Sequence, residues 1–220
     1  MIVLSTKKLL LNQKELLLNA GVTFVEYDSI KIDFVDFELP QKVQLAIFTS
    51  QNGVISFLNS QSGSNRNWSI EKIFCVGDKT KKLLEENGLK VVKTAQNSSE
   101  LGSFIAKRYK NEQFYYFCGS KRRNELPEII NASENELFEV KTYKTTLNSK
   151  KFDQNWDGIL FFSPSGVASF TMNNKMNNSV AFCIGNTTAS EAKKHTDKIV
   201  LANTTTVESV IAKAVKTLRK

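Results

Sequence analysis

Six short turns of this chain carry hydroxyl side chains directly after an apolar run. Each turn contains serine or threonine, and only one of them contains a carboxylate, that of Asp78. The turns are "STKK" from residue 5, "TSQNG" from 49, "GDKT" from 77, "GSKRR" from 119, "SPSG" from 163 and "GNTT" from 185. Turns that lead into helices present free N–H groups and the positive end of the helix dipole, which attract anions. The chemistry that they favour is the binding of an acidic ligand, although each hydroxyl also suits a helix N-cap.

Other kinds of catalytic chemistry lack their usual sequence marks. The chain has one histidine, His195, in a polar stretch where a surface position is expected. It contains no HExxH zinc motif, GxSxG nucleophile elbow, Walker loop or GxGxxG fingerprint. A catalytic site must therefore work with backbone amides, hydroxyl groups, a few cations and a phenol.

The residues around these turns predict alternating strands and helices. Short apolar runs bounded by Gly, Ser, Thr or Asn are typical of buried parallel strands. Such runs lie at residues 2–4, 45–48, 73–76, 89–92, 114–118, 158–162, 180–184 and 199–201. Amphipathic stretches separate them, such as "DKTKKLLEENG", with Asp78 as the expected N-cap and Gly88 as the expected end. This order predicts parallel sheets with helices on both faces, and ligands bind beyond the carboxyl ends of such strands.

The chain repeats itself with an offset of about 113 positions. "IFTSQNGVISF" from residue 47 resembles "FFSPSGVASF" from 161, and "CVGDKTKKLLEENGLKVV" from 75 resembles "CIGNTTASEAKKHTDKIV" from 183. "FVEYDSI" from 24 lies over "LFEVKTY" from 137, which places Glu26 over Glu139. Because the matches keep the same order along the chain, we infer an internal duplication.

The segments "FVEYDSIKI" (24–32) and "FEVKTYKTT" (138–146) differ from the other runs, because apolar and polar residues alternate and no helix follows. As equivalents under the duplication, they are expected to pair antiparallel and to bridge two domains. The expected fold class is therefore α/β, with two doubly wound parallel-sheet domains related by internal duplication and joined by a two-stranded antiparallel β ladder.

The composition narrows the class of protein. A chain of 220 residues, 41% of them hydrophobic, can bury one large core or two modest ones. No run approaches the roughly 18 apolar residues of a membrane span, and the start lacks the features of a signal peptide. Cys75, Cys118 and Cys183 lie in strand-like runs without a CxxC pair, as expected for buried thiols in a reducing, cytoplasmic compartment. The formal charge of +8 suggests nucleic acid, an acidic small molecule or no specific partner.

Six phrases follow one another along the chain: "IFTSQNGV", "CVGDKT", "GSKRRNELPEI", "VKTYKT", "FFSPSGVASF" and "IGNTTA". In this order they resemble the uroporphyrinogen-III synthase family over essentially the full chain. The resemblance implies that the N-terminal strand unit packs with the C-terminal half. The expected domains are residues 1–25 plus 146–220 and residues 33–136, with linker strands at 26–32 and 137–145.

The resemblance also implies an activity, the closure of the linear tetrapyrrole hydroxymethylbilane to uroporphyrinogen III. Ring D is inverted, water is released, and no cofactor or metal is needed. The eight carboxylates of this substrate suit a cradle of hydroxyls, amides and cations in a cleft between two domains.

Tyr143 in "VKTYKT" matches the tyrosine that the family places at the cleft. It is either the general acid for the departing hydroxyl or a residue that packs within the ladder. Lys7 stands where family members often have arginine, so the charge is kept but the bidentate fork is lost. The expected substrate-binding residues are Thr6, Lys7, Thr49, Ser50, Asn52, Gly77, Thr80, Ser120, Arg122, Ser163, Ser165, Gly166, Gly185, Thr187 and Thr188.

Two other functions stay open at this point. Two hinged α/β lobes would also suit a non-catalytic binding protein for an acidic small molecule. The basic charge suggests a nucleic-acid protein, but that function requires a basic stripe with stacking aromatics, whereas most of the 15 Phe fall in strand or core positions. We expect a monomer that binds neither nucleic acid nor membranes and makes at most transient contact with the preceding pathway enzyme.

Overall fold

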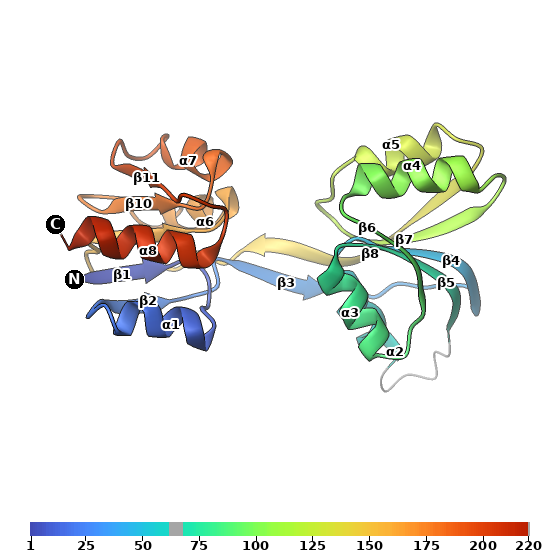
Figure 1. The fold of residues 1–220 in the computed structure, drawn as a ribbon, viewed down its shortest axis with the longest axis horizontal. Coiled ribbons are helices and arrows are strands. Elements are labelled where there is room, and N and C mark those ends of the chain that lie inside the picture. Colours follow the sequence, from blue (N-terminus) through green and yellow to red (C-terminus); the bar gives the residue numbers. More distant parts are fainter. Residues whose placement is uncertain (62–67, 220) are drawn as a thin grey trace. The chain divides into compact units, whose positions relative to one another are not determined.

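The computed structural model describes residues 1–61 and 68–219, which form two compact units. The first unit joins Met1–Lys31 to Thr146–Lys220, and the second is Ile32–Thr145. Each unit is one sheet with helices on both faces (Figure 1). Among the described residues, no helix has the length and apolar content needed to cross a bilayer.

The first unit contains a parallel sheet in the order β11-β10-β9-β1-β2. The strands are β1 (Ile2–Ser5), β2 (Thr23–Glu26), β9 (Gly158–Phe161), β10 (Val180–Cys183) and β11 (Ile199–Leu201). One face packs against α1 (Leu11–Leu18) and α8 (Val207–Leu218), and the other against α6 (Pro164–Thr171) and α7 (Asn186–Ala192). Because both faces are covered, β9, β10 and β11 carry no polar side chain except the thiol of Cys183, as the short runs in the sequence predict.

The second unit contains a sheet in the order β3-β8-β7-β4-β5-β6, in which the strands from β8 to β6 are parallel. The strands are β3 (Ile30–Phe34), β4 (Lys42–Phe48), β5 (Ser69–Val76), β6 (Val91–Ala95), β7 (Gln113–Gly119) and β8 (Glu136–Leu147). One face packs against α2 (Gln51–Gln61) and α3 (Asp78–Glu86), and the other against α4 (Ser98–Arg108) and α5 (Glu125–Asn131). Phe48 and Phe117, from adjacent strands, stack in this core with ring centroids 4.5 Å apart.

The two sheets repeat one strand order. β11, β10, β9, β1 and β2 of the first sheet correspond in turn to β6, β5, β4, β7 and β8 of the second. The phrases that match in sequence lie on corresponding elements, since residues 161–170 form the end of β9 and α6, and residues 47–57 form the end of β4 and α2. The topology therefore supports the inferred duplication. Each strand expected from the apolar runs is present, with the one expected at 89–92 shifted to β6.

The segments expected as linker strands lie largely within the sheets. Residues 24–26 belong to β2 and pair with β1, and Glu136–Tyr143 pairs in parallel with β7. The other side of β8 pairs with β3, and the arrows of these two strands point in opposite directions in Figure 1. The ladder is thus formed by β3, which includes residues 30–32 of the expected linker strand 26–32, and by β8. Within β2, exposed and half-buried residues alternate, because successive side chains of a strand point to opposite faces, and residues 27–29 lie between β2 and β3.

Two local expectations have different outcomes in α3. Asp78 is not its N-cap, because Gly77 holds that position with a φ of 83° and Asp78 is the first helical residue. A carboxylate in the first turn still interacts favourably with the helix dipole. The expected end is confirmed, since Asn87 is the C-cap and Gly88 follows in the left-handed region with a φ of 74°. The three cysteines are buried and free, as the sequence predicts.

Candidate functional site

The hydroxyl-rich turns gather at one edge of each sheet. In the first unit the turns from residues 5, 163 and 185 follow β1, β9 and β10, which are adjacent parallel strands. In the second unit the turns from residues 49, 77 and 119 follow β4, β5 and β7. Within each unit, the three turns share the carboxyl edge of the sheet, where ligands of such folds bind. The expectation of one shared cleft stays a prediction, because the structure defines each unit by itself.

A pocket of about 320 Å³ opens at this edge of the second unit. We call it the tyrosine pocket, because the phenols of Tyr116 and Tyr143 both line it. Among the predicted residues it includes Thr49, Ser50, Arg122 and Tyr143. The remaining lining residues are Val76, Gln96, Asn97, Ser98, Tyr116, Gly119, Lys121, Arg123 and Glu125.

Two hydroxyl–phenol pairs define the floor of the tyrosine pocket. Thr49 Oγ1 lies 3.0 Å from Tyr116 OH, and Ser50 Oγ lies 2.9 Å from Tyr143 OH. Tyr143 comes from β8 and Ser50 follows β4, so the ring must cross the end of β7, which lies between them. It crosses at Gly119, where an added Cβ would lie only 2.6 Å from Tyr143 Cε2. The missing side chain of Gly119 is therefore what lets Tyr143 reach Ser50.

Tyr116 was not expected from the sequence as a site residue. Its side chain is buried, and burial raises the pKa of the phenol, although the hydrogen bond with Thr49 offsets part of that effect. The residue therefore stays a neutral phenol at the base of the tyrosine pocket. Its position within an apolar strand made it resemble a core residue, and only the neighbouring strand end shows that its hydroxyl reaches the pocket.

The cations of the tyrosine pocket differ in their availability. Arg122 Nε donates to Glu139 Oε2 at 2.8 Å and Arg122 Nη2 donates to Glu139 Oε1, an arrangement that raises the pKa of the arginine, chiefly through this hydrogen bonding. Its charge is therefore already paired. Lys121 and Arg123 are exposed and form no ion pair within the described part of the chain. These two flanking residues, which the prediction left out, are the cations that remain for an anionic ligand.

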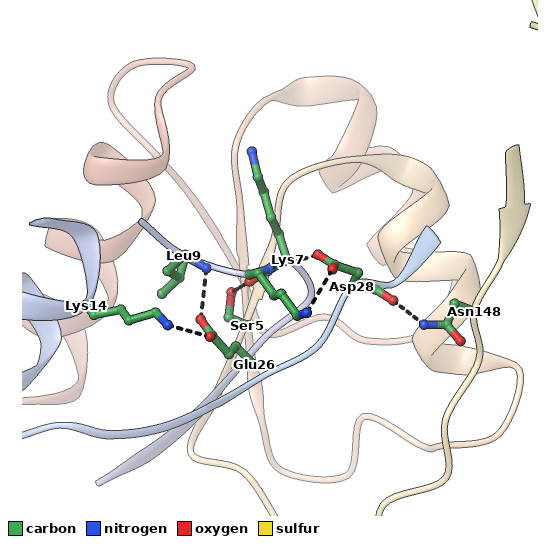
Figure 2. Close-up of polar contacts among 8 residues, drawn as sticks. Ser5, Lys7, Leu9, Lys14, Glu26, Asp28 and Asn148 are labelled. Atoms are coloured by element: carbon green, nitrogen blue, oxygen red, sulfur yellow. Dashed lines mark hydrogen bonds and ion pairs between the residues drawn. The ribbon is translucent and has the colours of Figure 1, made fainter. Parts of the chain in front are cut away.

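The turn after β1 in the first unit is held by carboxylates (Figure 2). Glu26 accepts from the Leu9 N–H at 2.8 Å and from Lys14 Nζ at 2.6 Å, and Asp28 accepts from the Lys8 N–H at 3.1 Å. These backbone donors are thus occupied within the unit. The side chain of Lys7 points away from both carboxylates, so its ammonium group is the part of this turn that can meet an anion.

Glu26 and Glu139, which overlay in the sequence repeat, perform the same task in the two units. Glu26 lies on β2, next to β1, and its carboxylate binds the loop that follows β1. Glu139 lies on β8, next to β7, and its carboxylate binds the loop that follows β7. The duplication has therefore kept a carboxylate that fixes a basic turn at the carboxyl edge of each sheet.

Replacing Glu26 by glutamine should destabilise the first unit by about 1–2 kcal/mol at neutral pH, through the loss of charge-assisted hydrogen bonds. Burial would raise the pKa of Glu26, but hydrogen bonds from Lys14 and the Leu9 N–H outweigh it, so the pKa lies below its usual value. The stabilisation is therefore fully present at pH values above the ordinary pKa of a glutamate, and it is lost as the pH falls through the lowered pKa of the folded state.

Thermal unfolding at pH 7 and at successively lower pH checks this prediction. The Glu26→Gln protein should melt earlier than wild type at pH 7, and the two should converge in acid. Glu15→Gln, at an exposed position of α1, is the matched control and should melt like wild type. A difference for Glu26→Gln that persists unchanged in acid would show that the charge of Glu26 is not its source.

Several predicted residues of the first unit have partners inside the fold. Thr6 is buried, and its hydroxyl donates to the Leu160 carbonyl at 2.7 Å. Ser163 caps α6, since its Oγ accepts from the Gly166 N–H at 3.1 Å, and it also lies 2.9 Å from Ser165 Oγ. A Cβ at Gly166 would lie 3.1 Å from Thr6 Oγ1, so these two turns pack closely. The hydroxyl groups of Thr6, Ser163 and Ser165 thus stabilise the turns at the carboxyl edge of the first sheet.

The other predicted residues are placed as follows. Gly185 precedes α7, Thr187 is exposed and Thr188 is buried. In the second unit, Asn52, Gly77, Thr80 and Ser120 lie outside the described lining of the tyrosine pocket. The Ser120 N–H still contributes, because it donates to the Tyr143 carbonyl at 2.9 Å and so fixes the backbone of that residue.

Comparison with known proteins identifies related sequences. A family model described as uroporphyrinogen-III synthase HemD matches residues 13–212. A curated relative, the porphyrin biosynthesis protein HemD of Ruminiclostridium josui, is 28% identical over 228 aligned positions. That alignment covers 90% of this chain and 44% of the relative, so the chain spans less than half the length of the curated relative.

Solved structures share the fold. The uroporphyrinogen-III synthetase of Helicobacter pylori superposes with a TM-score of 0.73 at 18% identity, covering 98% of both chains. A mutant uroporphyrinogen III synthase of Thermus thermophilus superposes with a TM-score of 0.58 at 14% identity, covering 100% of this chain and 98% of that one. At these identities the likeness is one of fold.

Proposed function

Since the chain belongs to the HemD uroporphyrinogen-III synthase family, we propose that it closes hydroxymethylbilane to uroporphyrinogen III, inverting ring D and releasing water. The protein would then be a lyase of porphyrin biosynthesis. The observation that carries the proposal is the family match, which extends over both units. The tyrosine pocket supports it, because phenols, hydroxyls and unpaired cations are the groups that this reaction needs.

Tyr143 is the proposed general acid. As the hydroxyl of the substrate departs, the phenol supplies the proton that makes it water, and the carbon–oxygen bond breaks to leave a cationic azafulvene. Attack by the substituted carbon of ring D, fragmentation and final closure follow. The proton lost at the final closure returns to the phenolate, so that only water is released and the phenol is regenerated.

The carboxylates of the substrate are proposed to meet the unpaired cations and the hydroxyl groups of the turns. Each such charge-assisted contact contributes about 1.5–3 kcal/mol when well formed, and less at exposed positions. These contacts with the carboxylates serve mainly to fix the conformation of the substrate rather than to increase affinity. An azafulvene that is not held would be attacked by the nearer, unsubstituted position of ring D, which gives the wrong isomer. Orientation of reacting groups is worth orders of magnitude in rate.

The binding of substrate carboxylates by unpaired cations can be tested in each unit separately, at Lys7 in the first unit and at Arg123 in the second. Lys7→Ala and Arg123→Ala should each raise KM about threefold to tenfold with little change in kcat, since ground-state and transition-state binding are lost together. Lys7→Arg should keep the wild-type KM. Lys216→Ala, at an exposed position of α8, is the control for the change in net charge. If only the variant of one unit changes KM, the expectation that both units act on one substrate is wrong.

The decisive experiment supplies freshly made hydroxymethylbilane to the protein and separates the product isomers by chromatography. We expect the type III isomer, formed much faster than in the absence of protein. Formation of the type I isomer alone, at the uncatalysed rate, would contradict the proposal. Tight binding of the substrate without any type III product would instead favour the non-catalytic binding protein.

We also propose that the protein works in the cytoplasm as a monomer, with at most transient contact with the enzyme that supplies hydroxymethylbilane. The three buried, free cysteines fit a reducing compartment. Sedimentation of the purified protein across a range of concentrations tests the monomer.

A further inference from the structure

We propose that Ser50 is a positioning residue, which holds the phenol of Tyr143 and directs its proton into the tyrosine pocket. This role rests on the proposed function and deepens it, because the sequence suggested only that Ser50 contacts the substrate. The inference starts from the contact between Ser50 Oγ and Tyr143 OH, which are 2.9 Å apart and come from positions 93 residues apart in the chain.

The position of Ser50 is itself fixed. It directly precedes α2, and its Oγ accepts from the Gly53 N–H at 3.2 Å, as an N-capping hydroxyl does. The side chain therefore has a defined orientation at the positive end of a helix of 11 residues. A serine held in this way offers Tyr143 a contact of defined position.

The Gly53 contact also bears on the direction of the second hydrogen bond. The Gly53 N–H fills one acceptor position of Ser50 Oγ, and the serine O–H remains available as a donor. When Ser50 donates to the phenol oxygen, the hydrogen of Tyr143 is directed away from Ser50. Because Tyr143 lines the tyrosine pocket, that hydrogen then faces the space in which the departing hydroxyl would lie.

The same hydrogen bond becomes stronger during the reaction. When the Tyr143 O–H bond breaks and the proton passes to the departing hydroxyl, the phenol oxygen becomes an anion. A hydrogen bond to an anion is about twice as strong as one between neutral groups, so the contact with Ser50 is stronger after proton transfer than before it. Only such differential interactions raise kcat.

Ser50→Ala should therefore lower kcat about tenfold and leave KM unchanged, whereas Ser50→Thr, which keeps the hydroxyl, should recover most of the activity. The expected signature is a double-mutant cycle with Tyr143→Phe. Without the phenol oxygen, Ser50→Ala has nothing left to remove, and it should not slow the reaction further. A general loss of structure or of substrate contacts would instead add to the effect of Tyr143→Phe.

Ser56 provides the matched control. Its hydroxyl donates to the Thr142 carbonyl at 2.8 Å, so it links α2 to β8 one residue before Tyr143 without touching the phenol. If Ser50→Ala lowers kcat because it removes the hydrogen bond to the Tyr143 phenol, Ser56→Ala should keep the wild-type kcat.

The possible results separate the two proposals. A wild-type protein that makes the type III isomer, with Ser50→Ala as active as wild type, overturns the role of Ser50 alone. An effect of Ser50→Ala that appears only in KM, or that persists in full in the Tyr143→Phe background, also overturns it. A wild-type protein without type III product overturns the proposed function, and the role of Ser50 with it.

Discussion

Tyr143→Phe should lower the turnover of hydroxymethylbilane by about a hundredfold, which is at the lower end of what a general acid contributes. The change removes one oxygen atom and leaves the ring over Gly119, so the fold should persist. The measurement is the rate of type III product under saturating substrate, together with the circular dichroism spectrum and the melting temperature of the variant. Because binding does not require the phenol proton, KM should change little.

Tyr115→Phe is the matched control for this loss. Tyr115 lies on β7 in the same unit, but its ring stacks on Phe138 with centroids 5.2 Å apart, outside the described lining of the tyrosine pocket. The same removal of a phenol oxygen there should leave turnover unchanged. If Tyr143→Phe were as active as Tyr115→Phe, Tyr143 would be a packing residue of its strand and the proton would have another source.

The sheets were predictable because their signal is local. Runs such as 73–76 and 180–184 are short and apolar and are each followed by a glycine, and parallel strands covered on both faces require such apolar composition. The edge at which the turns gather follows from the same reasoning, since parallel strands end on one side. The order of the strands was not predictable in this way, because it depends on contacts between distant segments.

The tyrosine pocket depends on that order. Tyr143 was named from the resemblance and Ser50 as a separate contact, but nothing local shows that they meet. They meet because β7 lies between β8 and β4 and ends in Gly119, over which the ring passes. Tyr116 was missed for the same reason, since its strand position is apolar in character while its hydroxyl reaches Thr49 on the neighbouring strand end.

Arg122 has a partner that the sequence analysis did not name. The resemblance implies a substrate contact, which stays a prediction; the structure places Arg122 in the lining of the tyrosine pocket and also pairs it with Glu139. The repeat did contain the relevant signal, because Glu139 overlays Glu26 and a carboxylate kept in both copies indicates a shared structural task. An ion pair between β8 and the turn after β7 could have been inferred from that equivalence once β2 was known to lie beside β1.

Gly119→Ala should abolish most of the activity through Tyr143 alone, with a loss of about a hundredfold. The new Cβ would lie 2.6 Å from Cε2, 2.7 Å from Cζ and 3.1 Å from the hydroxyl oxygen of Tyr143, so the ring has to move. Gly119 does not have a positive φ, so its backbone accepts alanine without strain and the collision with the ring is the whole effect. Movement of the ring separates the phenol from Ser50.

Gly102→Ala is the control for adding a methyl group to this unit. Its Cβ would lie 3.1 Å from side-chain atoms of Ile129, which belongs to the contact between α4 and α5 and lies outside the described lining of the tyrosine pocket. That variant should keep the wild-type turnover. Combining Gly119→Ala with Tyr143→Phe should cost no more than Tyr143→Phe alone, because both changes remove the same positioned phenol. Full activity of Gly119→Ala would mean that the ring does not need its place over Gly119, and the geometry proposed for proton transfer would be wrong.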